Sequence, residues 1–365
     1  MPGKMPDCTI SSEWGAFTMT NIERTRIEKD TMGEMAVPIE AYYGASTQRA
    51  VLNFPISDLR YPTDFIRILG LIKEAAAEVN VKLGLLDPEI GQVIAIASSE
   101  ISKGEFSDQF PIDLFQTGSG TSTNTNANEV IARRAAEHLR STTSKKPHPN
   151  DHVNMCQSSN DVIPTATHLT IAQAIKDQLI PAVKAAETTL REKACELWPV
   201  IKTGRTHLQD ATPIRLGQEF QGYADQLSLT LRRVEDHIDM LSEVALGGTA
   251  VGTGINAHPD FSSGVCAILA KRLGLPVRET PHHFQAQGTQ DTLLAASGAI
   301  RTTAISLQKI ANDLRWLSSG PRAGLAELEL PAVQPGSSIM PGKINPVIPE
   351  SLLQVVCQVI GNDAA

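Results

Sequence analysis

Residues 220–241 read FQGYADQLSLTLRRVEDHIDML, and the spacing of the apolar residues in this stretch indicates the fold class. Its apolar residues recur at alternating spacings of four and three, whereas the positions between them are mostly polar or charged. That spacing predicts an amphipathic helix whose apolar seam faces neighbouring helices, as in a coiled-coil-like bundle. The seam consists of Phe220, Ala224, Leu227, Leu231, Val234, Ile238 and Leu241.

Two further stretches repeat this pattern, one before and one after it. Helices of such length, about 30–45 Å at 1.5 Å per residue, predict an elongated helical bundle. Three separate amphipathic surface helices are the alternative. The earlier seam consists of Ile175, Leu179, Val183, Ala186, Leu190, Ala194 and Leu197, and the later one of Ile300, Thr303, Leu307, Ile310, Leu314 and Leu317.

Composition agrees with a mostly helical protein. Aromatic residues make up 4% of the 365 residues, against 41% apolar residues overall, so Ala, Leu, Ile and Val must fill the core. Helices with so little aromatic bulk are expected to pack their seams against other subunits as well as each other. The length predicts two or three domains. An amphipathic stretch near 64–83 lies within an N-terminal third that is otherwise mixed in pattern.

Charge and cysteine usage exclude several classes of protein. The net charge of −8 disfavours a nucleic-acid binder, and no apolar run approaches the length of a membrane span. The first residues carry no apolar stretch typical of a secretory signal. Five scattered cysteines fit neither a disulfide framework nor a metal site, which indicates a reducing compartment. An apolar stretch that begins at Ser351 runs to the end of the chain without a cap, which we interpret as a truncated bundle helix.

Three polar segments are too rich in Gly, Ser, Thr and Asn to form a core. The first, 116–129, is expected to open a helix, and a helix N-terminus favours an anion such as a carboxylate. An elaborate N-cap with three asparagines in turns is the alternative. The second, 148–161, has two histidines four residues apart, but Pro149 opposes a regular helix and the Glu of a zinc HExxH motif is absent.

The third segment, 336–350, contains two glycines and three prolines, typical of a shaped loop that can still hinge. Lys343 and Asn345 supply donors suited to a carboxylate. A separate motif, GRTHLQD at 204–210, places His207 before the long helix, where a lone histidine is either structural or catalytic. The GTGINA run at 252–257 lacks a strand–helix–strand context for nucleotide binding, and neither a P-loop nor a hydrolase elbow occurs.

In these segments the chain resembles the fumarase/aspartase superfamily. The third segment, GSSIMPGKINP, is similar to its long signature GSSxMPxKxNP, and the specific match is to class II fumarate hydratase. Supporting stretches occur in family order from RIEKDTMG at 26–33 through GTAVGTG at 248–254 to SSGPR at 318–322. The chain lacks about the last hundred residues of that pattern.

The resemblance implies a mostly helical, fumarase/aspartase-like subunit with an elongated central bundle and a smaller mixed N-terminal domain. It implies a homotetramer whose active sites each draw on three subunits. We expect an N-terminal lyase domain over 1–157 and an incomplete central bundle domain over 158–365. The implied protein is a cytoplasmic enzyme of the tricarboxylic acid cycle that needs no cofactor and no metal, and has no nucleic-acid or membrane partner.

The resemblance also implies roles for single residues. The catalytic set is Ser337 on the mobile loop with His207 and its partner Glu350. Substrate-binding residues are Ser119, Gly120, Thr121, Asn124, Ser158, Ser159, Asn160, Thr206, Ser338, Lys343, Ile344 and Asn345. A secondary anion site comprises His148, Pro149, Asn150 and Asp151, where Lys145 and Cys156 depart from the residues common in the family.

The expected reaction is the reversible hydration of fumarate to (S)-malate by anti addition and elimination. Removing the proton beside a carboxylate creates an aci-carboxylate, which Lys343, Asn345 and loop amides would stabilise. Ser337 would be the base, and His207 with Glu350 would protonate the leaving hydroxide through a water. Aspartate ammonia-lyase is the nearest alternative, which the VIPE ending at 347–350 favours and His207 and Gly342 oppose. A non-catalytic relative, as among lens crystallins, and an inactive fragment are further alternatives.

Overall fold

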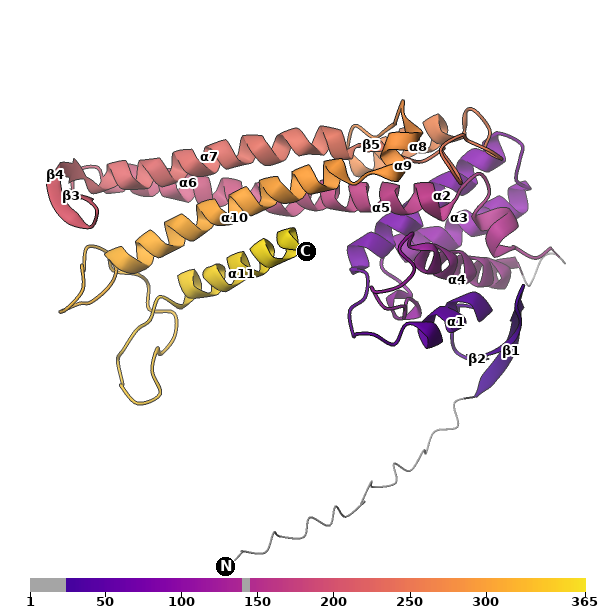
Figure 1. Cartoon of the computed structure of the whole chain (residues 1–365), viewed down its shortest axis with the longest axis horizontal. Helices are drawn as coiled ribbons and strands as arrows, with labels where there is room; N and C mark the ends of the chain where they lie inside the picture. Colours follow the sequence, from indigo (N-terminus) through magenta and orange to yellow (C-terminus); the bar gives the residue numbers. More distant parts are fainter. Residues whose placement is uncertain (1–23, 140–144) are drawn as a thin grey trace, which may run out of the picture.

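The computed structural model describes residues 24–139 and 145–365, and most of them are helical. Figure 1 shows an elongated bundle that leads at one end into a more compact group of short helices and a hairpin. This arrangement confirms the predicted fold class. The expectation that the chain has no secretory signal depends on residues 1–23, which lie outside the described part.

The predicted long helices are present. The first runs from α5 (Ser159–Ala174) through the π-helical turn η3 (Ile175–Leu179) into α6 (Ile180–Glu196). Pro181, at the start of α6, has no N–H to donate to the preceding turn, which accounts for the wider turn. The bundle is completed by α7 (Leu216–Leu241), α10 (Asp291–Leu317) and α11 (Val347–Ala364), and Figure 1 shows these helices side by side.

The predicted seams form the core of the bundle. Val183 on α6, Leu227 on α7 and Ile310 on α10 are buried in one cluster at the end of the bundle that is distant from the N-terminal helices. A second, larger cluster joins the other end of α5 and α7 to those N-terminal helices. This packing excludes the alternative of three separate surface helices. Helix α11 buries only Val356 among its side chains and leaves Val355 exposed.

The N-terminal helices surround this larger cluster. Buried Leu69 and Ile72 on α2 pack in it with Ile94 on α3 and Ile131 on α4. The elements in this part are β1 (Thr25–Asp30), β2 (Gly33–Pro38), α1 (Ala45–Asn53), α2 (Thr63–Lys82), α3 (Pro88–Ser102), η1 (Ser107–Gln109), α4 (Thr121–Leu139) and η2 (Pro149–Val153). Helix α2 thus confirms the amphipathic stretch expected near 64–83.

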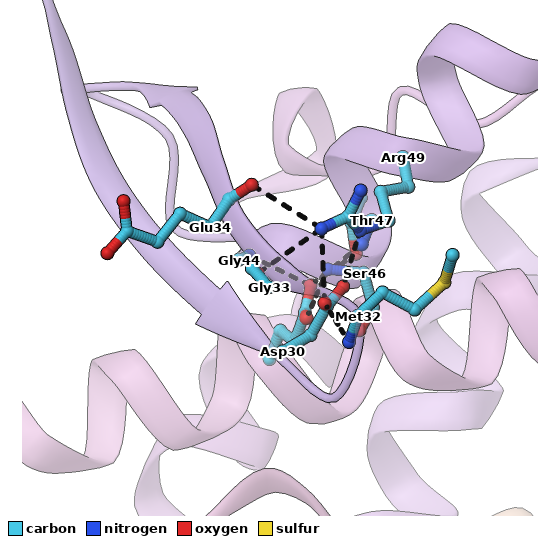
Figure 2. Close-up of polar contacts among 9 residues, drawn as sticks. Asp30, Met32, Gly33, Glu34, Gly44, Ser46, Thr47 and Arg49 are labelled. Carbon is cyan, nitrogen blue, oxygen red and sulfur yellow. Dashed lines mark hydrogen bonds and ion pairs between the residues drawn. The ribbon is translucent and has the colours of Figure 1, made fainter.

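An arginine on α1 holds the β1–β2 hairpin in place (Figure 2). The guanidinium of Arg49 donates to the carboxylate of Asp30 at 2.8 and 3.2 Å and to the carbonyl of Gly33 at 3.2 Å. Asp30 also accepts from the amide of Met32 across the turn at 2.9 Å. These bonds hold the pKa of Asp30 below its usual value, with the Arg49 hydrogen bond as the largest cause.

A second hairpin, which the sequence analysis did not predict, closes the far end of the bundle. Strands β3 (Ile201–Thr206) and β4 (Gln209–Arg215) pair antiparallel, and the turn between them consists of His207 and Leu208. Both turn residues have positive φ, 53° and 62°. Such a two-residue turn usually contains Asn or Gly, so its sequence signal is absent here.

The remaining elements connect α7 to α10 and α10 to α11. Strands β5 (Glu243–Val244) and β6 (Arg278–Glu279) pair in parallel, and α8 (Phe261–Leu273) lies between them in the sequence. Helix α9 (His283–Gly288) precedes α10. The GTGINA run lies in the loop between β5 and α8, so two short parallel strands do flank that helix, which the sequence did not predict. The signature segment lies in the long loop 318–346. Within the described residues, no helix is long and apolar enough to span a membrane.

Candidate active site

The first polar segment opens a helix, as predicted. Gly120 adopts a left-handed φ of 67° immediately before α4, where an added Cβ would lie 2.9 Å from the side chain of Ile163. The hydroxyl groups of Ser119 and Thr121 lie 2.8 Å apart at this helix start. Because the first amides of a helix point outward, this turn presents N–H donors together with hydroxyl groups.

The three asparagines of this segment lie within the helix rather than in turns. Asn124, Asn126 and Asn128 are buried on α4. The Nδ2 of Asn124 donates to the side-chain oxygen of Asn154 and to the hydroxyl of Ser159, both at 3.1 Å. The alternative that these three asparagines lie in turns is therefore wrong.

The second polar segment starts α5 with a capping box. Ser158 is the N-cap, and the carboxylate of Asp161 accepts from the amide of Ser158 at 2.9 Å. Asp161 also accepts from the amides of Gly247 and Thr249 at 3.1 and 2.9 Å. Burial raises the pKa of Asp161, although these amides and the charge of Lys73 act in the opposite direction.

A cavity of about 530 Å³ lies between these two helix starts. It brings together four of the predicted substrate-binding residues from α4 and from the start of α5. Asn150, predicted for the secondary anion site, lines the same cavity, as does Cys156, whose thiol has a pKa raised by burial. The predicted residues that line it are Thr121, Asn124, Ser158 and Ser159, and the walls also include Asn128, Asn154 and Thr249.

A fully buried lysine on α2, which the sequence analysis did not single out, supports one wall of the cavity. The Nζ of Lys73 donates to the side-chain oxygens of Asn154 and Gln157, each at 2.9 Å. Burial lowers the pKa of Lys73 to about 7, against the effect of the negative charge of Asp161. A lysine within the apolar stretch of an amphipathic helix was the available signal, because lysine is almost never fully buried without partners.

The predicted secondary anion residues form a π-helical turn. The Nδ1 of His148 accepts from the amide of Asp151 at 3.1 Å, and the amide of His148 donates to the Nδ1 of His152 at 2.8 Å. Lys145 forms ion pairs with Asp87 and Glu89, each at 2.7 Å. Nowhere in 24–139 or 145–365 do three His, Cys, Asp or Glu residues come together as a metal-binding group.

His207 lies at the exposed tip of the β3–β4 hairpin, next to Thr206. Strand β3 of this hairpin is joined to the loop 318–346 through Glu327, which pairs with Arg205 and Lys202. The side chain of Lys202 is 8% exposed and that of Glu327 is 18% exposed, so the cluster is largely shielded from solvent. The hairpin and the signature loop are thus held at the same end of the bundle.

Within that loop, hydrogen bonds fold the signature segment back on itself. The amide of Gly336 donates to the carbonyl of Lys343 at 2.8 Å, and the Nδ2 of Asn345 donates to the carbonyl of Gly336 at 2.8 Å. The hydroxyl oxygen of Ser337 accepts from the amides of Ile339 and Met340 at 3.3 and 3.1 Å.

The neighbouring side chains of the loop are accessible from solvent. Ser338, Lys343 and Ile344 are exposed, and Glu350 lies half-buried in the first turn of α11.

The predicted catalytic and binding residues therefore fall into three groups along the molecule. The residues that line the cavity come from α4, from the segment leading into α5 and from the loop after β5. Figure 1 shows α4 at one end of the molecule and the β3–β4 hairpin, whose turn contains His207, at the other, with the loop between α10 and α11 at the hairpin's end. One chain alone does not bring the cavity and His207 together. The side chain of Asn160, a predicted substrate-binding residue, already bonds within the chain, because its Nδ2 donates to the carbonyl of Ala250 at 2.7 Å.

An elongated bundle with three donor-rich segments, one of them GSSIMPGKINP, defines a lyase of the fumarase/aspartase type. The family model described as lyase matches residues 33–361. Class II fumarate hydratases from Mycobacterium tuberculosis (strain CDC 1551 / Oshkosh) and Halobacterium salinarum are each 55% identical to this chain. The first alignment covers 93% of this chain and 71% of that protein, and the second covers 94% and 73%.

A solved class II fumarase from Schistosoma mansoni matches with a TM-score of 0.91 and 40% identity, over 93% of this chain and 75% of that one. The chain belongs to this lyase family, among the class II fumarate hydratases.

Proposed function

We propose that this protein catalyses the reversible hydration of fumarate to (S)-malate by anti addition and elimination of water. The observation that carries the proposal is the cavity between the starts of α4 and α5, which is lined by residues with hydroxyl and amide groups. Such donors suit a dicarboxylate. The identity with fumarate hydratases supports the choice of substrate.

Ser337 is the proposed base. A free serine hydroxyl is too weak an acid to supply an alkoxide, so its alkoxide must be stabilised by positive charge and N–H donors. The two loop amides that donate to its oxygen supply part of that stabilisation. Lys343 in the same loop supplies charge, and Lys343 with Asn345 would stabilise the aci-carboxylate.

His207 and Glu350 are proposed to deliver the proton that hydroxide needs to leave, through a bound water. Thr206, Ser338 and Ile344 complete the proposed substrate-binding residues on this side. Ser119, Gly120 and Asn160 complete those beside the cavity. His148, Pro149, Asn150 and Asp151 remain a proposed secondary anion site, which supplies no step of the reaction.

Because one chain keeps the cavity apart from His207, we propose that copies of the chain share their residues in a homotetramer, each site drawing on three of them. Exposed apolar side chains on three bundle helices, Leu229, Ile305 and Val355, support association along the bundle. We also propose that the enzyme is cytoplasmic and that each subunit is divided into an N-terminal domain, 1–157, and a bundle domain, 158–365.

The decisive experiment follows the absorbance of fumarate with purified protein, first with malate and then with aspartate as substrate. We expect turnover of malate only, because His207 and Gly342 follow the hydratase pattern. A Ser337→Ala preparation, purified in the same way, measures contaminating activity. Release of ammonia from aspartate without malate turnover would establish the aspartate ammonia-lyase alternative instead.

Mixing two inactive variants tests the shared site. If Ser337 and His207 of one site come from different copies, Ser337→Ala and His207→Asn proteins unfolded and refolded together regain activity. Up to about a quarter of the sites would then hold both native residues. Activity that stays at the level of the separate variants would mean that each chain supplies both residues itself.

A further inference from the structure

Thr249 is held in an unusual backbone conformation beside the cavity. Its φ is 55°, in the left-handed region that β-branched residues avoid. Gly or Asn would occupy this position with less strain, since glycine has no Cβ and asparagine bonds to its own backbone. Local folding therefore does not explain a threonine here, and strained residues of this kind cluster at functional sites.

The backbone around Thr249 is fixed from two sides. Its amide donates to the buried carboxylate of Asp161 at 2.9 Å, and its carbonyl accepts from the Nε2 of Gln287 at 2.7 Å. The next residue, Ala250, accepts from the side chain of Asn160 at 2.7 Å. These bonds join the loop to the start of α5 and to α9, so the direction of the Thr249 side chain is set by its surroundings.

Thr249 lines the cavity, yet its hydroxyl bonds to no other group in the described part of the chain. Thr249 is 4% exposed, and its Oγ1 is buried without a hydrogen-bond partner in the described part of the chain. A buried hydroxyl left unpaired costs free energy comparable to a lost hydrogen bond. Asn124 and Asn128, which line the same cavity, also have buried side-chain oxygens without partners. Three residues that line one cavity thus carry side-chain oxygens without a partner.

We propose that Thr249 is a further substrate-binding residue, whose hydroxyl donates a hydrogen bond to a carboxylate oxygen of the dicarboxylate in this cavity. The inference rests on the proposed function for its substrate class. Asp161 is then a positioning residue, because it holds the amide of Thr249 without facing the substrate itself. The GTAVGTG stretch at 248–254 thereby gains a role for its second residue.

The test compares Thr249→Val, which keeps the shape but removes the hydroxyl, with Thr249→Ser, which keeps the hydroxyl. The matched control is Thr230→Val on α7, since Thr230 is also buried with an unpartnered hydroxyl but does not line the cavity. Two quantities are measured in each protein: kcat/KM for malate, and the affinity for succinate, a dicarboxylate that cannot be dehydrated.

We expect Thr249→Val to lower kcat/KM and succinate affinity by roughly ten- to a hundredfold, the worth of a hydrogen bond to a charged group. Thr249→Ser and Thr230→Val should stay within about threefold of the native protein in both quantities. Thr249→Gly should unfold at the same temperature as the native protein or higher, since it removes the strain, while it binds succinate as poorly as Thr249→Val.

Each result judges the inference. Succinate affinity and kcat/KM unchanged in Thr249→Val would overturn it, as would equal losses in Thr230→Val. If the native protein binds succinate but turns over no malate, the proposed reaction fails, while the succinate comparison still decides the role of Thr249. If the native protein binds no succinate, the cavity does not take a dicarboxylate and the inference fails with it.

Discussion

The Nζ of Lys73 lies 2.9 Å from the side-chain oxygen of Asn154, in a place that no solvent reaches. The same oxygen accepts from the Nδ2 of Asn124, which also contacts the hydroxyl of Ser159. A single buried ammonium group on α2 therefore orients a chain of hydrogen bonds that ends at the cavity wall. Such networks hold the side chains that they connect in fixed orientations.

The buried ammonium should make stability depend on pH. Burial lowers the pKa of Lys73 from 10.5 to about 7, so between these values the folded protein holds a neutral amine while the unfolded chain binds a proton. The free energy of unfolding should therefore rise with pH across this window, by up to about 1.4 kcal/mol per pH unit. Below pH 7 both states bind the proton and the contribution becomes constant.

Urea titrations of the native protein, Lys73→Met and Lys82→Met between pH 6 and pH 10 measure this effect. Lys82 is the matched control, because it is an exposed lysine on the same helix. We expect Lys73→Met to lose the rise and Lys82→Met to retain it. Curves that run parallel for all three proteins would show that Lys73 keeps an ordinary pKa in the folded state.

Chelators should leave the activity unchanged. The two histidines with metal-like spacing are bound into their own turn, where the Nδ1 atoms of His148 and His152 accept backbone hydrogen bonds. The proposed mechanism uses Ser337, Lys343 and amide donors, none of which needs a metal. Malate turnover after incubation with EDTA, and again after adding back Mg²⁺ or Zn²⁺, should equal that of untreated protein. Loss of activity that one metal restores would contradict the mechanism.

The long helices were predictable because their signal is periodic. Val183, Leu227 and Ile310 recur at helical spacing with their neighbours, and a seam of this kind can be buried in few other ways. The β3–β4 hairpin was not predictable from local sequence, because His207 and Leu208 adopt positive φ without the usual Gly or Asn.

The candidate site was predictable segment by segment but not as an arrangement. Ser158 and Asp161 form a capping box, a helix-start pattern that involves only residues close together in the sequence. Lys73 bonds to the wall residue Asn154 and Thr249 lines the cavity, and both come from segments far away in the sequence, so only the fold brings them there. Their side chains carry no motif spacing relative to Asn124, and sequence reasoning missed them for that reason.

Replacing Glu327 should weaken the junction between hairpin and loop. Burial would raise the pKa of Glu327, but hydrogen bonds and charge from Arg205 and Lys202 outweigh it and hold this pKa below 4.5. Glu327→Gln leaves Arg205 without the carboxylate it pairs with and leaves Lys202 paired with Glu219 alone. It should lower the free energy of unfolding by about 1–3 kcal/mol at neutral pH. Native protein should lose this contribution as the pH falls below 4.5, so the two proteins should converge in acid.

Denaturant titrations at pH 7 and at low pH check both parts of this prediction. Glu196→Gln provides the control, because Glu196 pairs with Lys193 on an exposed surface and such pairs contribute little. A Glu327→Gln protein as stable as the Glu196→Gln protein at pH 7 would show that the cluster does not hold the two segments together.

Replacing the proposed base should affect chemistry far more than binding. Ser337→Ala removes the hydroxyl that two loop amides contact, while Lys343 and Asn345 stay in the same fold of the loop. We expect kcat to fall by at least about 10³, with the affinity for succinate largely kept, as for a group that acts mainly in the transition state. Steady-state kinetics and succinate binding are measured on the same preparations, with Ser351→Ala as control, since Ser351 is an exposed serine on α11. A fall in kcat of tenfold or less would assign the base to another residue. An equal fall in Ser351→Ala would mean that the effect is not specific to the signature loop.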